Sequence, residues 1–574
     1  MSLPGWRDWL FSSKTFAAAM LAVYLGLLMS LPRPYWAMAT VYICSQPLSG
    51  ATSSKAVYRV VGTLVGAVAA VTMVPNLVNA PGLLVGALTL WIAACLFVSL
   101  LDRTPRSYAT MLAGYTAALI GFPAVTDPGA IFDTALARVE EITLGIVCAA
   151  LVSRLVFPQS VGRVIAAKAN SWMGDAAQIT LGILGGDNDH ATTRRGLVQL
   201  SGHAAEIDTL ATHLRYEPSR GRDTGLLVEA LRLRMLAILP VLSSIDDRLA
   251  MLRQDGTALP PPLPALLGQL RGWIRPGPPS LDDDARLRET VGANRLRAAL
   301  RDAEPPIDTA SNWRDVVVAS LLIRLRELVD LASDGRALRR SMATGTGLKG
   351  PLAFRSEAGI SAAHHRDASM ALLSALAVAI AVVLTSAIWI GTGWPDGSAA
   401  PMMAAVACCF FAAQDDPVPA ILQFANWTGV AVALMAVYQF AVFPLVHDFE
   451  ILVLVLAPLF LVVGTLISMP ATTGRGLAIA ANGATVLALQ STYGADFQSY
   501  VNSNLALLLG MYAGAIVMRL TRSVGAEWAI WRLIGSARGT IARAAERRGA
   551  EDRARFAGLM LDRLGLIAPR LAAL

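Results

Sequence analysis

Two segments near opposite ends of the chain are versions of one membrane sequence, and this duplication constrains the fold more than any other feature. Residues 132–155 (FDTALARVEEITLGIVCAALVSRL) align with residues 497–520 (FQSYVNSNLALLLGMYAGAIVMRL) at one constant offset. The identities are Phe132 with Phe497, Gly145 with Gly510, Arg154 with Arg519 and Leu155 with Leu520. Duplicated membrane halves are a common architecture of transporters, and the substrate path then runs between the repeats.

The composition excludes an ordinary soluble enzyme. Hydrophobic residues make up 55% of the chain and charged residues only 16%, and the mean hydropathy is +0.53. The net charge of +7 is best explained by Lys and Arg on the cytoplasmic side of a membrane. We expect no nucleic-acid partner, because no basic patch is interleaved with aromatic residues. The five cysteines lie in apolar stretches without metal-ligand spacing, so we expect no metal site.

Hydropathy predicts twelve membrane spans, six on each side of a more polar region. They lie near 15–31, 36–47, 57–75, 82–101, 109–125 and 133–157, and near 368–392, 400–413, 420–443, 450–469, 475–491 and 503–520. The second span of each half is short and ends in a Gln that is followed by Pro47 or, after two aspartates, by Pro417. Short, broken spans at matching positions in two halves indicate a binding site.

We therefore predict an all-α polytopic membrane protein built from two parallel six-helix transmembrane repeats. The first repeat is 1–157 and the second 368–522, separated by a helical cytoplasmic domain, 158–367, and followed by a helical cytoplasmic tail, 523–574. The distribution of Lys and Arg places both termini in the cytoplasm. The first apolar run resembles a secretory signal, but further spans follow it directly, so we expect it to be retained. The amphipathic tail either packs on the cytoplasmic domain or lies along the inner leaflet.

One motif opens the third span, Arg59-Val-Val-Gly62-Thr63-Leu-Val-Gly66. Gly62 and Gly66 share one helix face and let another helix approach closely. Arg59 either extends to the membrane surface beside this packing face or faces a cavity and binds an anionic substrate together with Thr63. A guanidinium pairs bidentately with a carboxylate, which favours an organic acid in the second case.

A second motif, Arg138-Val-Glu140-Glu141, lies in the sixth span ahead of Gly145. Arg138 and Glu141 are three residues apart and neighbours on a helix. Ionisable groups inside a span are costly and face a cavity or each other. The motif is therefore either a structural ion pair or a proton-coupling site on Glu140 or Glu141. In the second half Ser503 and Ala506 occupy the positions of Arg138 and Glu141, so only the first half keeps the charges.

A third set of polar residues is associated with the broken spans and could line a path at the membrane centre. Its members are Gln46, Gln414, Asp415, Asp416, Gln423, Trp427 and Asn482. The aspartates are equally consistent with loop charges. The aromatic residues Tyr35, Trp36 and Tyr115 either stack on a planar ligand or belong to an interfacial belt. No Walker A, HExxH or nucleophile-elbow motif occurs, so we expect neither a cofactor nor an enzymatic activity.

With these motifs and this layout, the chain resembles the fusaric acid resistance family, which includes aromatic acid exporters. The resemblance implies a multi-pass transporter of the bacterial inner membrane that exports aromatic carboxylic acids or related toxic organic anions, driven by protons. It also implies a periplasmic membrane-fusion protein as a partner. Arg59, Gly62, Thr63 and Gly66 match the first family motif, and Arg138, Glu141 and Gly145 match the second. Gln423, Asn426 and Trp427 replace the first motif in the second half, which speaks against two equivalent sites.

Two other functions stay open at the level of sequence. One is an organic-anion channel of the same fold. The other is a membrane scaffold or sensor that acts through its cytoplasmic domain, although a scaffold has no need of intramembrane charges. The expected partners are a small organic anion, membrane lipid and, as an alternative to a monomer, further copies of the chain.

Overall fold

The computed structural model describes residues 3–187, 189–214, 221–254, 259–275, 283–309, 311–345, 347–348, 350–354, 365–522, 526–546, 556, 559–560, 562–567 and 570. These described residues form helices, with no strand among them. The chain divides into two compact units. The first comprises residues 1–159 and 366–525, and the second 160–365 and 526–574.

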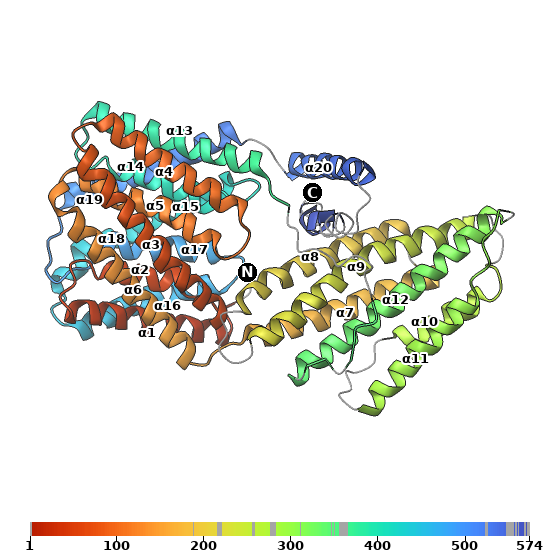
Figure 1. Cartoon of the computed structure of the whole chain (residues 1–574). Helices are drawn as coiled ribbons and strands as arrows, with labels where there is room; N and C mark the ends of the chain where they lie inside the picture. The colour runs from red at the N-terminus through yellow and green to blue at the C-terminus, as the bar shows by residue number, and fades with distance from the viewer. Residues whose placement is uncertain are drawn as a thin grey trace. The chain divides into compact units, whose positions relative to one another are not determined.

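The first unit is a bundle of apolar helices (Figure 1). From its first segment come α1 (Trp6–Leu28), α2 (Tyr35–Cys44), α3 (Ser49–Leu77), α4 (Pro81–Leu101), α5 (Ser107–Gly121), η1 (Pro123–Val125), η2 (Pro128–Ala130) and α6 (Ile131–Leu155). From its second come α13 (Ala368–Thr392), α14 (Ala399–Phe411), α15 (Val418–Val437), η3 (Tyr438–Val442), η4 (Phe443–Leu445), α16 (Phe449–Ser468), α17 (Thr473–Leu477), η5 (Ala478–Asn482), α18 (Gly483–Leu487) and α19 (Phe497–Thr521).

Eight helices of the described residues are long and apolar enough to cross a bilayer: α1, α3, α4, α5, α13, α15, α16 and α19. The chain is thus a multi-pass membrane protein. The two short spans are also helices, α2 with 10 residues and α14 with 13. Helix α2 ends three residues before Pro47, because a proline disfavours the helical conformation of the residue before it. Helix α6 has 25 residues and carries the charges of the second motif.

The predicted span over 475–491 is a shorter helical segment in the structure and contains a π-turn. The chain forms α17, the π-helical turn η5 and α18, and Ala488 ends this segment in the left-handed conformation with φ +47°. A π-turn accommodates one extra residue and often marks a functional position in a helix. Asn482 closes the turn and its Nδ2 donates to Thr428 Oγ1 at 2.7 Å.

Corresponding helices of the two segments make corresponding contacts. Helix α1 packs on α16 and, in the reciprocal pair, α13 packs on α4. Helix α6 packs on α2, and α19 packs on α14. The duplicated glycines lie at these last two contacts. Gly145 faces the carbonyl oxygen of Ala37 in α2, and Gly510 faces that of Ala400 in α14. A side chain at either glycine would overlap that backbone.

The apolar core of the first unit joins both segments of the chain. One cluster combines Leu88 and Ile92 of α4 with Val378 of α13. The other combines Tyr42 of α2 with Phe460 of α16, whose rings lie 5.4 Å apart. Neither segment therefore forms a separate domain.

The second unit contains amphipathic helices. They are α7 (Val161–Gly185), α8 (His190–Leu214), α9 (Gly221–Gln254), α10 (Leu263–Ile274), α11 (Asp283–Asp302), α12 (Trp313–Thr344) and α20 (Ala526–Glu546). Helices α7, α8, α9 and α12 pack in sequence, and α11 lies on α12. Asp334 of α12 accepts from Arg234 Nε at 2.9 Å and from the N–H groups of Ala353 and Phe354 at 2.6 and 3.1 Å.

Candidate functional site

The first motif places its arginine against the short helix α2. Arg59 is 5% exposed. Its guanidinium donates to the Tyr108 hydroxyl of α5 at 2.9 Å and to Thr40 Oγ1 of α2 at 3.5 Å. Arg59 therefore lies where α2, α3 and α5 meet, and it is turned inward rather than extended to the membrane surface.

The glycines of this motif bring α5 close enough for that contact. A Cβ built on Gly62 would lie 2.6 Å from the Ala109 carbonyl oxygen, and one on Gly66 would lie 2.7 Å from Thr116 Cβ. Both values are shorter than real Cβ contacts, so any larger residue would separate α3 from α5. The close packing of these helices holds Tyr108 within hydrogen-bonding distance of Arg59.

The arginine of the second motif contacts α2 at Trp36, one helical turn before Thr40. The Arg138 guanidinium carbon lies 4.4 Å from the centre of the Trp36 ring, which is a cation–π distance. The guanidinium of Arg33 lies 5.0 Å from the same ring. Trp36 and Thr40 are four residues apart, so both arginines of the motifs contact one face of α2.

Arg138 and Glu141 form no ion pair in the described part of the chain, contrary to the structural interpretation of their spacing. Glu141 is fully buried, and its Oε1 accepts the backbone N–H of Arg33 at 2.6 Å, while the Arg138 guanidinium lies over Trp36. The two charges still interact through space. Glu140 is exposed on the bundle, so the structure leaves it outside this site.

Several buried polar atoms around α2 have no hydrogen-bond partner among the described residues: Arg59 Nε, Thr63 Oγ1, Thr116 Oγ1, Arg138 Nε and Glu141 Oε2. An unpartnered buried polar group costs about 1–3 kcal/mol. Within those same residues, no carboxylate pairs with the guanidinium of Arg59 or Arg138. The positive charges of the two arginines also act on each other. A bound anion would supply the missing acceptors and relieve this repulsion.

The candidate polar residues of the second half occupy other positions. The carbonyl oxygens of Gln414 and Asp415 accept from Arg522 at 2.7 and 3.4 Å, which favours a structural role for this loop. Gln423 is exposed, and Trp427 lies under the guanidinium of Arg475 at 5.7 Å. Asp416 Oδ1 accepts the N–H of Val418, and Asn482 bonds Thr428. No hydrogen bond of the described residues links these second-half residues to Arg59 or Arg138. Gln46, in the first half, lines a cleft at the end of α2.

Sequence reasoning missed three residues near α2. Thr40 and Tyr108 contact Arg59, and no local pattern distinguishes them from packing residues. Lys14 is 9% exposed within α1. Lys14 is a lone charge inside an apolar run. This position was sufficient to select it as a site candidate, because charges within a span usually face a cavity.

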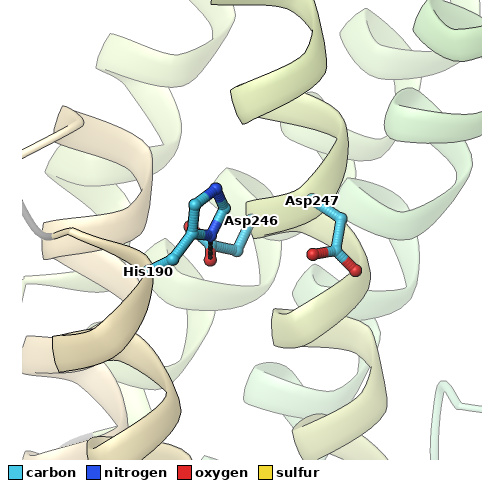
Figure 2. A group of neighbouring side chains, drawn as sticks. All are labelled: His190, Asp246 and Asp247. Atoms are coloured by element: carbon cyan, nitrogen blue, oxygen red, sulfur yellow. Dashed lines mark hydrogen bonds and ion pairs between the residues drawn. The ribbon is translucent and has the colours of Figure 1, made fainter.

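Among the described residues of the second unit, one cluster has metal-ligand residue types, His190 with Asp246 and Asp247 (Figure 2). His190 Nδ1 lies 2.7 Å from Asp246 Oδ2. Asp247 stands to one side and makes no drawn contact with either residue. His190 and Asp247 are exposed. This is the geometry of a surface hydrogen bond, and we assign no ion to it.

Comparison with known proteins gives one consistent match. The family model described as the fusaric acid resistance protein family matches residues 8–574. The p-hydroxybenzoic acid efflux pump subunit AaeB of Edwardsiella ictaluri is 28% identical over 523 residues, covering 88% of this chain and 76% of the relative. The proteins of the same name from Edwardsiella tarda and Citrobacter koseri are 27% and 25% identical, each covering 89% of this chain and 76% and 75% of their own lengths.

Proposed function

This chain belongs to the fusaric acid resistance protein family, and from that premise we propose that it exports aromatic carboxylic acids or related toxic organic anions across a bacterial inner membrane. The relatives are named as efflux pump subunits for p-hydroxybenzoic acid. The membrane helices and the buried cationic site around α2 support the same class of function in this chain.

One observation carries the proposal: two buried arginines, with no carboxylate partner among the described residues, lie beside aromatic rings. Arg59 and Arg138 supply the guanidinium groups, which bind carboxylates bidentately. The Trp36 ring lies against Arg138, and the Tyr115 side chain is buried within electrostatic reach of Arg59. A molecule with a planar ring and one carboxylate matches both features, since the ring stacks on aromatic faces while the carboxylate accepts from the guanidinium groups.

Substitution of each arginine tests this assignment. Purified variants in proteoliposomes are assayed for p-hydroxybenzoate export, with protein amounts matched by quantitative blotting. Arg59→Met or Arg138→Met removes a charge-assisted contact of about 1.5–3 kcal/mol, so export falls about tenfold or more. The matched control is Arg475→Met, because Arg475 also lies over a tryptophan, but in the second half. An equal loss in all three variants would contradict a site confined to the first half.

We propose Glu141 as the group that couples protons to transport. One carboxylate oxygen is held by the Arg33 N–H and the other is unpartnered within the described chain. Ionised Glu141 and a substrate carboxylate compete for the positive field of Arg138, so protonation of Glu141 sets the affinity for substrate. The apparent affinity of the wild type is then pH-dependent, and Glu141→Gln makes it independent of pH.

An imposed pH gradient separates an exporter from an anion channel of the same fold. A coupled exporter moves p-hydroxybenzoate uphill when the gradient is applied, and Glu141→Gln abolishes uphill transport while leaving exchange. Flux that only dissipates the gradient of the anion, with Glu141→Gln behaving as the wild type, would identify a channel. Absence of any flux would leave only a scaffold or sensor.

For the architecture, we propose two parallel six-helix repeats, 1–157 and 368–522, with a cytoplasmic domain 158–367, a cytoplasmic tail 523–574 and both termini in the cytoplasm. The reciprocal contacts of α1 with α16 and of α13 with α4 support the duplication. Single cysteines at Gly129 and Asp187 in intact spheroplasts test the topology: an impermeant maleimide labels the first position only. A periplasmic membrane-fusion partner and a homo-oligomer are both tested by mild-detergent purification from the native membrane.

A further inference from the structure

A polar cleft lies at the far end of α2 from Trp36. It is formed where α2 ends and α3 begins, between the start of α1 and the end of α6. Its polar lining comes from Lys14, Thr15, Ser45, Gln46, Thr52 and Ser153, and the cleft is narrow, with room inside for about one water molecule. The remaining lining residues are apolar, among them Phe11 and Val152.

The cationic group of this cleft has no counter-ion in the part of the chain that the structure describes. Lys14 is 9% exposed, and neither a hydrogen bond nor an ion pair is recorded for it in the described residues. Ser153 is 8% exposed, and its Oγ has no partner within the described chain. A buried ammonium group and an unpaired hydroxyl at one cleft are donors that an anion would satisfy.

The cleft also continues a row of cations along α2. Arg138 lies at Trp36 and Arg59 at Thr40. Lys55 Nζ donates to the carbonyl oxygen of Ile43 at 2.9 Å, and Ser45 lines the cleft that holds Lys14. Consecutive contacts are two to four residues apart on this helix, so the whole row spans roughly 14 Å at 1.5 Å per residue. These positive groups therefore follow one another along α2.

We propose that the Lys14 cleft is a second carboxylate-binding site, where an organic anion loads before it moves along α2 to Arg59 and Arg138. Lys14 and Ser153 hold the carboxylate in the cleft, and the hydrocarbon part lies at the mouth of the cleft. This inference rests on the proposed function for its direction of use, but binding at the cleft is measurable without transport.

Cysteine protection tests the site directly in the full-length chain. The native cysteines Cys44, Cys95, Cys148, Cys408 and Cys409 are replaced by alanine, and Val152→Cys places one thiol at the cleft without changing the residues that hold the carboxylate. The probes are p-hydroxybenzoate and, for comparison, inorganic phosphate. p-Hydroxybenzoate slows maleimide labelling of this thiol at least fivefold, and phosphate at the same concentration does so less. Adding Lys14→Met abolishes the protection, Lys14→Arg preserves it, and Arg59→Met leaves it intact.

The outcomes separate the two proposals. No protection by p-hydroxybenzoate, or protection that survives Lys14→Met, overturns the second site even when transport is normal. Protection without transport upholds the site and overturns the export function. Equal protection by phosphate overturns the preference for an organic carboxylate. Lys168→Met is the charge control, because Lys168 is an exposed partner of Glu206 in the second unit, and it leaves labelling and protection unchanged.

Discussion

The duplicated glycines, Gly145 and Gly510, test two statements together. The two halves share the same helix contacts, whereas the proposed binding site lies in the first half only. At Gly145, an added Cβ would overlap the carbonyl oxygen of Ala37 and lie 3.0 Å from Thr40 Cβ. At Gly510 it would overlap the carbonyl oxygen of Ala400. A carbon and a carbonyl oxygen approach no closer than about 3.3 Å, so each pair of helices has to separate by a distance on the order of 1 Å. We therefore expect Gly145→Ala and Gly510→Ala to destabilise the protein alike, by about 1–3 kcal/mol, as overpacking does.

Their effects on transport differ. Gly145→Ala displaces α2, which carries Trp36 and Thr40 against the two arginines. Loss of one charge-assisted contact, about 1.5–3 kcal/mol, raises the KM for p-hydroxybenzoate about tenfold or more. Gly510→Ala displaces α14 and leaves the KM within about twofold.

Both quantities are measured on the same preparations. Thermal unfolding in detergent, followed by loss of the monodisperse peak, reports stability, and proteoliposome export reports KM. Gly86→Ala is the control, because Gly86 has no atom within 4 Å of an added Cβ. If Gly145→Ala and Gly510→Ala raised KM equally, the assignment of the binding chemistry to the first half would be refuted. If neither lowered the unfolding temperature, the packing argument itself would be wrong.

Three further predictions concern single contacts. Trp36→Leu keeps an apolar side chain beside Arg138 but removes the ring, so KM for p-hydroxybenzoate rises severalfold while KM for a non-aromatic acid rises less; equal changes would exclude ring stacking. Asp334→Ala removes the carboxylate that pairs with the Arg234 guanidinium, at a site where the aspartate is 3% exposed. The free energy of unfolding then falls by about 3–5 kcal/mol. Hydrogen exchange of α9 and α12 should accelerate, and unchanged exchange would contradict this role. Arg522→Met removes the hydrogen bonds to the carbonyl oxygens of residues 412 and 414. Protease cleavage between α14 and α15 therefore increases, and KM does not change. A change in KM without increased cleavage would assign this loop to the substrate path.

Much of the membrane unit was predictable because its determinants are local. Apolar length defines a span, and the spacing of Gly62 and Gly66 identifies one face of α3. The inward position of Arg59 was one of two interpretations of its motif, and its contact with Tyr108 agrees with it. Arg138 lies over Trp36 instead of pairing with Glu141, which the spacing of the motif did not predict. The π-turn that ends at Asn482 was not predicted, since a π-turn has no sequence pattern comparable to hydropathy.

The sequence by itself determined that this chain crosses a membrane several times, that its charged motifs lie in the first half, and that its family is that of the fusaric acid resistance proteins. Only the tertiary structure decided which side chains meet. Thr40 reaches Arg59 across a helix contact, and Lys14 shares a cleft with Ser153 although 139 residues separate them (153 − 14). Periodicity encodes which face of a helix is apolar, whereas the depth and angle at which two helices pack depend on every side chain at the contact. The row of cations along α2 is a product of that packing.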